Sequence, residues 1–248
     1  MPRPTNSVVI ALRVLEQVSQ DQPVGVSDVA KALDVPKSTA YRMLTTLASA
    51  GWTRQDTSGA WSLTLKAGVV GSRVAPAAGL ADLARPVMTE LSAATEESVR
   101  LWLVEKDTFL LVADVEGPHP VRAVVPEIAA DIPLHATAVG KAILATWPDA
   151  DLDAYLAAPL RQVNARTVTD PAELRRQVVE ARVLGYARVW KEAHDHVGGV
   201  AAAIVLPDGR TAALAVTFPT HRLSEELVAR FGALLTAAAA RIGTHLRT

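Results

Sequence analysis

The sequence predicts an α+β protein in two domains, a three-helix winged head followed by a larger domain around a mostly antiparallel sheet. Two observations support this fold class. About 60 residues at the start contain three helical periods and then a hairpin-like stretch. The rest of the chain mixes strand-like and helix-like segments without a strict βαβ order. The chain has 248 residues, half of them apolar, which is enough to form two cores.

The first helix of the head is predicted to begin near Asn6 or Ser7, because either side chain can cap a helix. Apolar residues then recur at helical spacing and predict one buried stripe. The predicted stripe consists of Val8, Leu12, Leu15 and Val18.

Ser27 is predicted to cap a second, short helix. After the turn "DVP", a third helix is predicted over about 36–50, with Gly51 ending it. Two short strands are predicted on either side of a turn at 56–59. Three helices and a hairpin in this order are typical of a winged helix-turn-helix.

The third helix carries candidate DNA-contacting residues, because the second helix of such a motif places its N-terminal residues against bases and phosphates. The candidates are Lys37, Ser38, Thr39, Tyr41 and Arg42. Residues 1–66 carry 7 Lys and Arg against 5 Asp and Glu, a net +2, and the remainder carries 18 against 21, a net −3. The asymmetry has the sign expected of a DNA-binding head but is small. The spacing alone leaves open that this helix face is merely solvated.

A helical connector is predicted over 65–78, so the predicted domains are 1–64, the connector, and 79–248. The second domain is predicted to open with a helix over about 80–95 and two antiparallel strands within 98–117. Further strands are predicted over 120–126, 186–193, 200–207 and 211–218, and further helices over 137–147, 149–157, 169–185 and 224–247.

Several motifs resemble those of one protein family. Residues 26–52, "VSDVAKALDVPKSTAYRMLTTLASAGW", and the following "GAWSLT" are similar to the DNA-binding head of the IclR family of bacterial transcriptional regulators. Downstream, "HPVR" (119–122), "PLHATAVGKAILA" (133–145), "TDPAELRRQVVEARVLGYA" (169–187) and "GVAAAIV" (199–205) resemble that family's effector-binding domain, in the family's order. The resemblance covers nearly the whole chain, and the ordered set is specific.

This resemblance implies a winged helix-turn-helix joined by a linker helix to a GAF-like domain that binds a small organic effector. It also implies a homodimer or homotetramer that binds a palindromic operator in double-stranded DNA through a recognition helix over 37–47. We therefore expect a ligand-responsive regulator and in particular a repressor. We expect no cofactor. We also expect no membrane association and a cytoplasmic location, because no apolar run reaches the roughly 18–20 residues of a membrane helix.

Carried over position by position, the resemblance implies an effector pocket. Its candidate residues are Arg100, Trp102, Arg122, His135, Ala138, Val139, Val189, Trp190, Gly199, Ala215 and Thr217. Some members that bind small keto acids have Asp, Cys and two Ser at positions occupied here by Val189, Gly199, Ala215 and Thr217. A small anion needs several hydrogen bonds to offset its lost hydration.

Our hypothesis is therefore a larger, partly apolar effector such as an aromatic acid. Trp102 and Trp190 are candidates to stack on it, and Arg100, Arg122 or His135 to hold its polar end. Each also has a structural interpretation: the tryptophans as core residues of strands, the arginines as members of ion pairs, and the histidine as a partner of backbone groups.

Other chemistries are weighed against this hypothesis. A phosphate-binding loop would need Gly at 135 and Ser or Thr at 142, where this chain has His135 and Ala142. His194 and His196 form a possible metal pair on one side of a strand, but no third ligand is evident. The alternative function is a small-molecule enzyme with an incidental three-helix head. The sequence does not favour it, because it contains no G-x-S-x-G elbow, no evident metal triad and no cysteine nucleophile.

Overall fold

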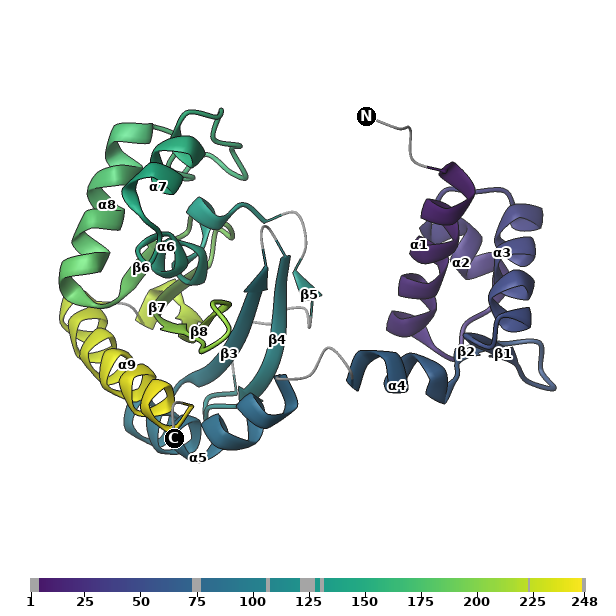
Figure 1. The fold of residues 1–248 in the computed structure, drawn as a ribbon, viewed down its shortest axis with the longest axis horizontal. Helices are drawn as coiled ribbons and strands as arrows, with labels where there is room; N and C mark the ends of the chain where they lie inside the picture. Colours follow the sequence, from purple (N-terminus) through teal and green to yellow (C-terminus); the bar gives the residue numbers. More distant parts are fainter. Residues whose placement is uncertain are drawn as a thin grey trace. The chain divides into compact units, whose positions relative to one another are not determined.

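The computed structural model describes residues 5–72, 77–105, 108–120, 128–129, 132–222 and 224–246. The chain divides into two compact units, Met1–Ala75 and Pro76–Thr248 (Figure 1). Each unit has its own apolar core. The boundary falls inside the predicted connector.

The N-terminal unit contains four helices and a two-stranded antiparallel sheet among its described residues. Its elements are α1 (Asn6–Asp21), α2 (Val26–Ala32), α3 (Lys37–Ser49), β1 (Thr53–Gln55), β2 (Trp61–Leu63) and α4 (Leu65–Ser72). The core of this unit lies between α1, α2, α3 and β2. Ala40, Leu44 and Leu47 of α3 are buried as predicted, and Gly51 follows with φ +79°. The helix-turn-helix and its hairpin are therefore present.

The predicted inner face of α1 is wrong at its N-terminal end. Val8 and Leu12 are 55% and 53% exposed, whereas Val14 and Val18 are fully buried. Apolar residues occupy two neighbouring stripes of α1, and α2 and α3 cover the stripe that contains Val14. Helical periodicity alone could not choose between the two stripes.

The predicted caps of the first two helices are also wrong. Thr5 is the N-cap of α1 and Gly25 that of α2, and neither makes a side-chain cap bond. Asn6, Ser7 and Ser27 lie within the first helical turns instead. Gly25 has extended backbone geometry, and its carbonyl accepts from the Asp28 and Val29 amides, so α2 begins two residues earlier than a cap at Ser27 would require.

The C-terminal unit is built on a six-stranded antiparallel sheet with the order β5-β4-β3-β8-β7-β6. The strands are β3 (Ser98–Glu105), β4 (Thr108–Val115), β5 (Ile128–Ala129), β6 (Ala187–Trp190), β7 (Val197–Val205) and β8 (Thr211–Pro219). The helices are α5 (Ala77–Thr95), η1 (Leu134–Ala136), α6 (Ala138–Leu144), α7 (Asp149–Leu156), α8 (Pro171–Leu184), η2 (Thr220–Arg222) and α9 (Glu225–His245). Apart from Pro120, the predicted strand over 120–126 falls on residues outside the described ranges.

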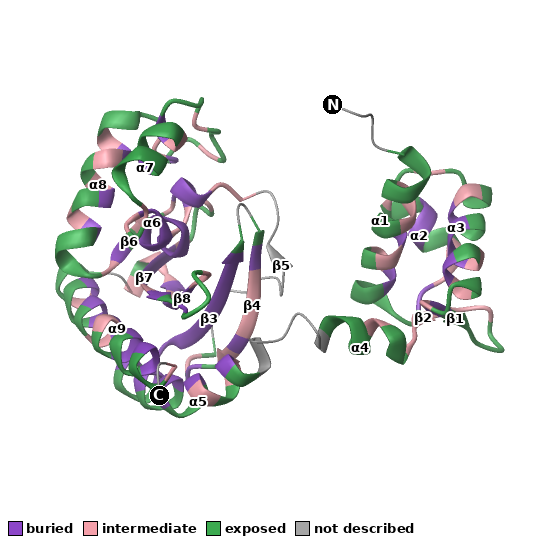
Figure 2. Cartoon of the chain, viewed as in Figure 1, coloured by how far each residue is buried: buried purple, intermediate pink, exposed green. Residues whose placement is uncertain are grey.

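Helices cover both faces of this sheet (Figure 1). Helices α5 and α9 pack on one face, and η1, α6, α7 and α8 pack on the other. Side chains alternate between the two cores along each strand, so Leu101 and Leu103 face α5 and α9 whereas Trp102 and Val104 face α6. Strand β3 and helix α6 are buried along almost their whole length (Figure 2).

Helix α9 is the one helix in the described ranges whose length and composition would suit a membrane span. Its Phe231, Leu235 and Ile242 are buried in the core beneath the sheet. We therefore interpret α9 as a core helix.

Two predicted elements are shorter than expected. The helix predicted over 137–147 is α6, which ends at Leu144. Pro148 is the N-cap of α7 and disfavours helical geometry at Trp147, so α6 could not extend to Trp147. The strand predicted over 186–193 ends at Trp190, where Lys191 adopts a left-handed φ of +63° and turns the chain.

Helix α8 has the ends that the sequence predicts. The Asp170 carboxylate accepts from the Ala172 amide at 3.1 Å, Pro171 is the first helical residue, and Gly185 closes the helix with φ +78°. Asp170→Ala should therefore lower the unfolding free energy of the C-terminal unit by about 1 kcal/mol, measured by thermal denaturation. Asp151→Ala, in the first turn of α7 but not at its cap, is the control and should change stability by less.

Candidate functional site

Helix α3 presents a polar row on the N-terminal unit. Lys37, Ser38, Tyr41 and Arg42 are exposed, and Thr39 is half-buried. The Arg42 carbonyl accepts from the hydroxyls of two threonines one turn on, whereas its guanidinium has no hydrogen-bond partner within the described residues. Tyr41 packs edge-on against Trp61 of β2, with ring centroids 6.3 Å apart. The row is therefore available to an external partner while its helix is held by the hairpin.

The hairpin tip beside α3 is ordered by one carboxylate. Asp56 accepts from the Ser58 amide at 2.9 Å, the Ser58 hydroxyl at 2.6 Å and the Ala60 amide at 3.0 Å. These hydrogen bonds, the one from the Ser58 side chain above all, lower the pKa of Asp56 below its usual value. Gly59 completes the turn with φ +87°, a conformation that favours glycine.

The C-terminal unit contains a cavity of about 110 Å³ between its sheet and the start of α6. Strands β3, β7 and β8 form one wall, η1 and α6 a second, and the segment after β6 a third. The lining residues are Trp102, Phe109, Ile132, Ala136, Thr137, Ala138, Val139, Val189, Ala193, His194, Val197, Gly198, Gly199, Ala215 and Thr217. Most of these are apolar, and the polar side chains are Thr137, Thr217 and His194.

The start of α6 is fixed by local bonds. The Thr137 hydroxyl oxygen accepts from the Gly140 amide at 2.9 Å and so caps the helix. This bond uses the oxygen as acceptor and leaves the hydroxyl proton able to donate into the cavity. An apolar chamber with a few polar groups at one side is typical of a small-molecule site.

Two models of known protein domains match the chain over most of its length. Residues 73–244 match the model of the C-terminal domain of bacterial transcriptional regulator IclR, and residues 7–57 match that of the IclR helix-turn-helix domain. The chain belongs to the IclR family of bacterial transcriptional regulators. It is a DNA-binding transcriptional regulator and not an enzyme, as expected from its motifs.

Individual IclR-family proteins resemble it along most of their length. The regulator KdgR of Escherichia coli (strain K12) is 28% identical over 249 residues, covering 99% of this chain and 94% of KdgR. The repressor AllR of the same organism is 32% identical, covering 89% of this chain and 82% of AllR. The crystal structure of an IclR homolog from Microbacterium hydrocarbonoxydans complexed with 4-hydroxybenzoate matches with a TM-score of 0.77 and 27% identity, covering 98% of this chain and 99% of that one.

Seven of the eleven effector residues expected from the IclR-family motifs line the cavity. They are Trp102, Ala138, Val139, Val189, Gly199, Ala215 and Thr217. Arg122 lies outside the described residues. The structure places the other three candidates, Arg100, His135 and Trp190, away from the lining.

These three candidates have other environments. The Arg100 side chain is buried, with its Nε 3.4 Å from the Asp114 carboxylate of β4. The His135 ring is buried between the Tyr155 hydroxyl, 2.8 Å from Nδ1, and the Arg161 carbonyl, 3.0 Å from Nε2. Trp190 lines a different, more polar cavity of about 250 Å³ between α8, β6 and α9.

His194 lines the cavity, whereas the sequence analysis predicts it on a strand as a possible metal ligand. Residues 194–196 lie in the loop between β6 and β7 and not on a strand, so the predicted pairing of His194 with His196 on one strand face is wrong. Among the described residues no group of three or more His, Cys, Asp or Glu side chains is arranged to hold a metal ion. Phe109, Ile132 and Val197 also line the cavity, and no motif in the sequence indicated them.

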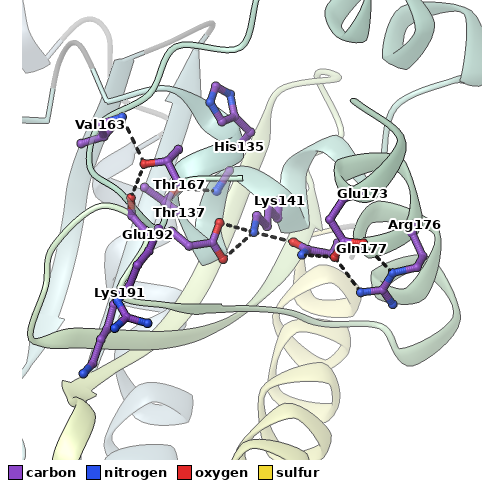
Figure 3. Close-up of polar contacts among 12 residues, drawn as sticks. His135, Thr137, Lys141, Val163, Thr167, Glu173, Arg176, Gln177, Lys191 and Glu192 are labelled. Atoms are coloured by element: carbon purple, nitrogen blue, oxygen red, sulfur yellow. Dashed lines mark hydrogen bonds and ion pairs between the residues drawn. The ribbon is translucent and has the colours of Figure 1, made fainter. Parts of the chain in front are cut away.

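Beside the cavity lies a buried ion pair that the sequence did not indicate (Figure 3). Lys141 Nζ lies 2.7 and 2.6 Å from the two carboxylate oxygens of Glu192 and donates to Gln177 Oε1 at 2.6 Å. Burial lowers the pKa of Lys141 and raises that of Glu192, and the charge of each partner opposes the shift of the other. Farther out, hydrogen bonds from Arg176 and Gln177 lower the pKa of Glu173 to about 2.

Proposed function

We propose that this chain is a repressor that binds a palindromic operator as a dimer or tetramer, and that an aromatic carboxylate in the C-terminal cavity controls this binding. The observation that carries the proposal is the apolar lining of that cavity. Val189, Gly199 and Ala215 contribute no hydrogen-bonding side chain, while Trp102 and Phe109 contribute aromatic surface. A small keto acid would lose its hydration there with few compensating bonds.

The size of the cavity limits the bound group to about one aromatic ring. Its volume is about 110 Å³, and engineered apolar cavities of roughly 150 Å³ bind benzene. The related protein from Microbacterium hydrocarbonoxydans was crystallised with 4-hydroxybenzoate. On this proposal the ring lies against Trp102, and Thr137, Thr217 and His194 bind the polar end. Arg100 and His135 then act as structural residues.

Dimer formation is supported by exposed apolar side chains of the N-terminal unit. They are Val8, Val9 and Leu12 of α1 and Leu65, Val69 and Val70 of α4. Such groups on a soluble protein commonly mark an interaction surface. A two-fold dimer would place two copies of α3 on the half-sites of a palindrome. Repression is supported by the named repressor AllR among the relatives, and such a regulator would act in the cytoplasm.

The start of α4 offers a route for control of the head. Lys66 Nζ donates to the Ala50 carbonyl at 2.8 Å and lies over the Trp52 ring, 5.2 Å from its centroid. The Thr64 hydroxyl donates to the Gly51 carbonyl. These contacts join α4 to the end of α3, so a change in the direction of the connector would move the recognition helix. An effector that binds one arrangement of the heads better than another then shifts operator occupancy.

The test is gel retardation of a DNA fragment from the gene's own upstream region. Benzoate and 4-hydroxybenzoate should change the operator affinity by about 5- to 150-fold, the usual range of allosteric coupling. Pyruvate and glyoxylate should leave it unchanged. An effect of the keto acids alone would refute the proposed effector class.

Gly199→Val should block the effector. A Cβ at this position would lie 3.5 Å from the Val216 carbonyl oxygen and 3.7 Å from the Ala138 Cβ, which are ordinary contacts, so the strand tolerates it. The two added methyl groups would occupy the cavity and weaken 4-hydroxybenzoate binding by about tenfold or more, measured by titration calorimetry. Ala203→Val, on the same face of β7 but away from the lining, is the matched control. Unchanged binding to Gly199→Val would place the effector elsewhere.

A further inference from the structure

The buried pair Lys141–Glu192 joins two walls of the cavity. Lys141 lies one helical turn after Ala138, and Glu192 directly precedes Ala193 and His194. Neither charged group is among the residues that line the cavity itself. The Lys141 side chain is 1% exposed, and all three of its ammonium protons have acceptors, two on Glu192 and one on Gln177.

The segment 191–194 has further anchors outside the cavity. The Thr167 hydroxyl donates to the Glu192 carbonyl at 2.8 Å and accepts from two backbone amides of its own loop (Figure 3). The Asn164 side-chain amide donates to the Lys191 carbonyl at 2.9 Å. Lys191 holds a left-handed φ of +63°, which is unfavourable for a residue with a Cβ. The loop therefore keeps this conformation through bonds from other elements, and the ion pair ties a side chain of the loop itself to α6.

We infer that Lys141 and Glu192 are a positioning pair that holds residues 191–194 against the cavity and thereby sets the affinity for the effector. This inference rests on the proposed function, because it takes the cavity as the effector site. An ion pair with directional hydrogen bonds fixes the distance between α6 and the loop, and with it the position of His194. Two apolar side chains of similar size would fill the space without fixing that distance.

Three variants separate positioning from stability. Lys141→Met alone leaves the Glu192 carboxylate buried without its cation and should unfold most easily. The double variant Lys141→Met/Glu192→Met removes both charges and should recover the melting temperature of the C-terminal unit. Glu90→Gln/Arg241→Gln removes an ion pair between α5 and α9 on the other face of the sheet and is the control.

Two readouts decide the inference, both on the full chain. The first is hydrogen–deuterium exchange without ligand, at the Lys191 amide, which donates to the Val197 carbonyl, and at the Val197 amide, which donates to the His194 carbonyl. Exchange there should be about tenfold faster in the folded double variant and unchanged in the control. The second is the dissociation constant for 4-hydroxybenzoate, which should rise about tenfold, the lower end of the loss found when the outer partners of metal ligands are removed.

Each outcome has a definite meaning. Unchanged exchange in the double variant would overturn the positioning role. Faster exchange with unchanged affinity would overturn the role of the pair in effector affinity. If the wild type does not bind 4-hydroxybenzoate, the proposed effector class fails, and the exchange comparison alone decides whether the pair anchors the loop.

Discussion

Gly140→Ala is expected to lower the unfolding free energy of the C-terminal unit by about 3 kcal/mol or more. This is at or above the largest loss usually found when a side chain is enlarged in a packed core. A Cβ on Gly140 would lie 2.1 Å from the carbonyl oxygen of Leu134 and 2.5 Å from its carbonyl carbon and Cα. No side-chain rotation can relieve this contact, because the Cβ position is set by the backbone and its neighbours are backbone atoms. Helix α6 and η1 would have to separate.

The matched control is Gly79→Ala. Gly79 is the third residue of α5, as Gly140 is the third residue of α6, and a Cβ there meets nothing within 4 Å. Helix propensity alone favours alanine over glycine by about 0.5–1 kcal/mol, so Gly79→Ala should raise stability slightly. Chemical denaturation followed by circular dichroism measures both. Equal and small effects of the two variants would show that α6 does not need the close approach to η1.

The same glycine explains a pattern that the sequence left without a role. Gly140 and Lys141 together look like part of a phosphate-binding loop, although the surrounding residues do not fit one. In the structure, Gly140 allows α6 to approach the Leu134 backbone, and Lys141 forms the buried pair with Glu192. The Gly140-Lys141 dipeptide therefore has a structural role: Gly140 contacts the nearby Leu134, and Lys141 pairs with Glu192, about 50 residues further along the chain. Such long-range contacts cannot be read from one sequence.

Local patterns predicted the elements well where one physical effect dominated. Helix α3 has a single apolar stripe, and α8 has a side-chain cap, a proline at its first position and a closing glycine, so both were located to within about two residues. Helix α1 has two adjacent apolar stripes, and the packing of other helices chose between them. The error at α1 therefore came from tertiary structure and not from the helix propensity of the segment.

The lining of the cavity was only partly predictable from the sequence. Five of the seven expected lining residues lie on β7, β8 and the start of α6, and the other two, Trp102 and Val189, lie on β3 and β6. The family resemblance indicated these residues because their elements meet in space. The imidazole of His135 makes it a candidate in the sequence, but Tyr155 and Arg161, from a later part of the chain, contact both of its ring nitrogens. The sequence indicates His194 only as a possible metal ligand, because it does not show that β6 ends at Trp190, before this residue.

Arg42→Ala is expected to weaken DNA binding by about 1–3 kcal/mol for each copy of α3 on the DNA, so in the proposed dimer the loss would occur at both half-sites. Arg42 lies on the exposed face of α3, and within the described residues its guanidinium has no hydrogen-bond partner that would compete with DNA. The weaker binding should appear without a change in melting temperature. Gel retardation or fluorescence anisotropy at moderate salt measures it.

Arg13→Ala is the matched control for this variant, because Arg13 is an exposed arginine of the same unit and lies on α1, outside the helix-turn-helix. It should change the affinity far less. If Arg42 binds a phosphate, the slope of log affinity against log salt should fall by about 1 for each phosphate that is no longer bound. If it instead forks onto a guanine, the salt dependence should change less and discrimination at one base pair of each half-site should relax. Wild-type affinity in Arg42→Ala would show that α3 does not read the operator through this residue.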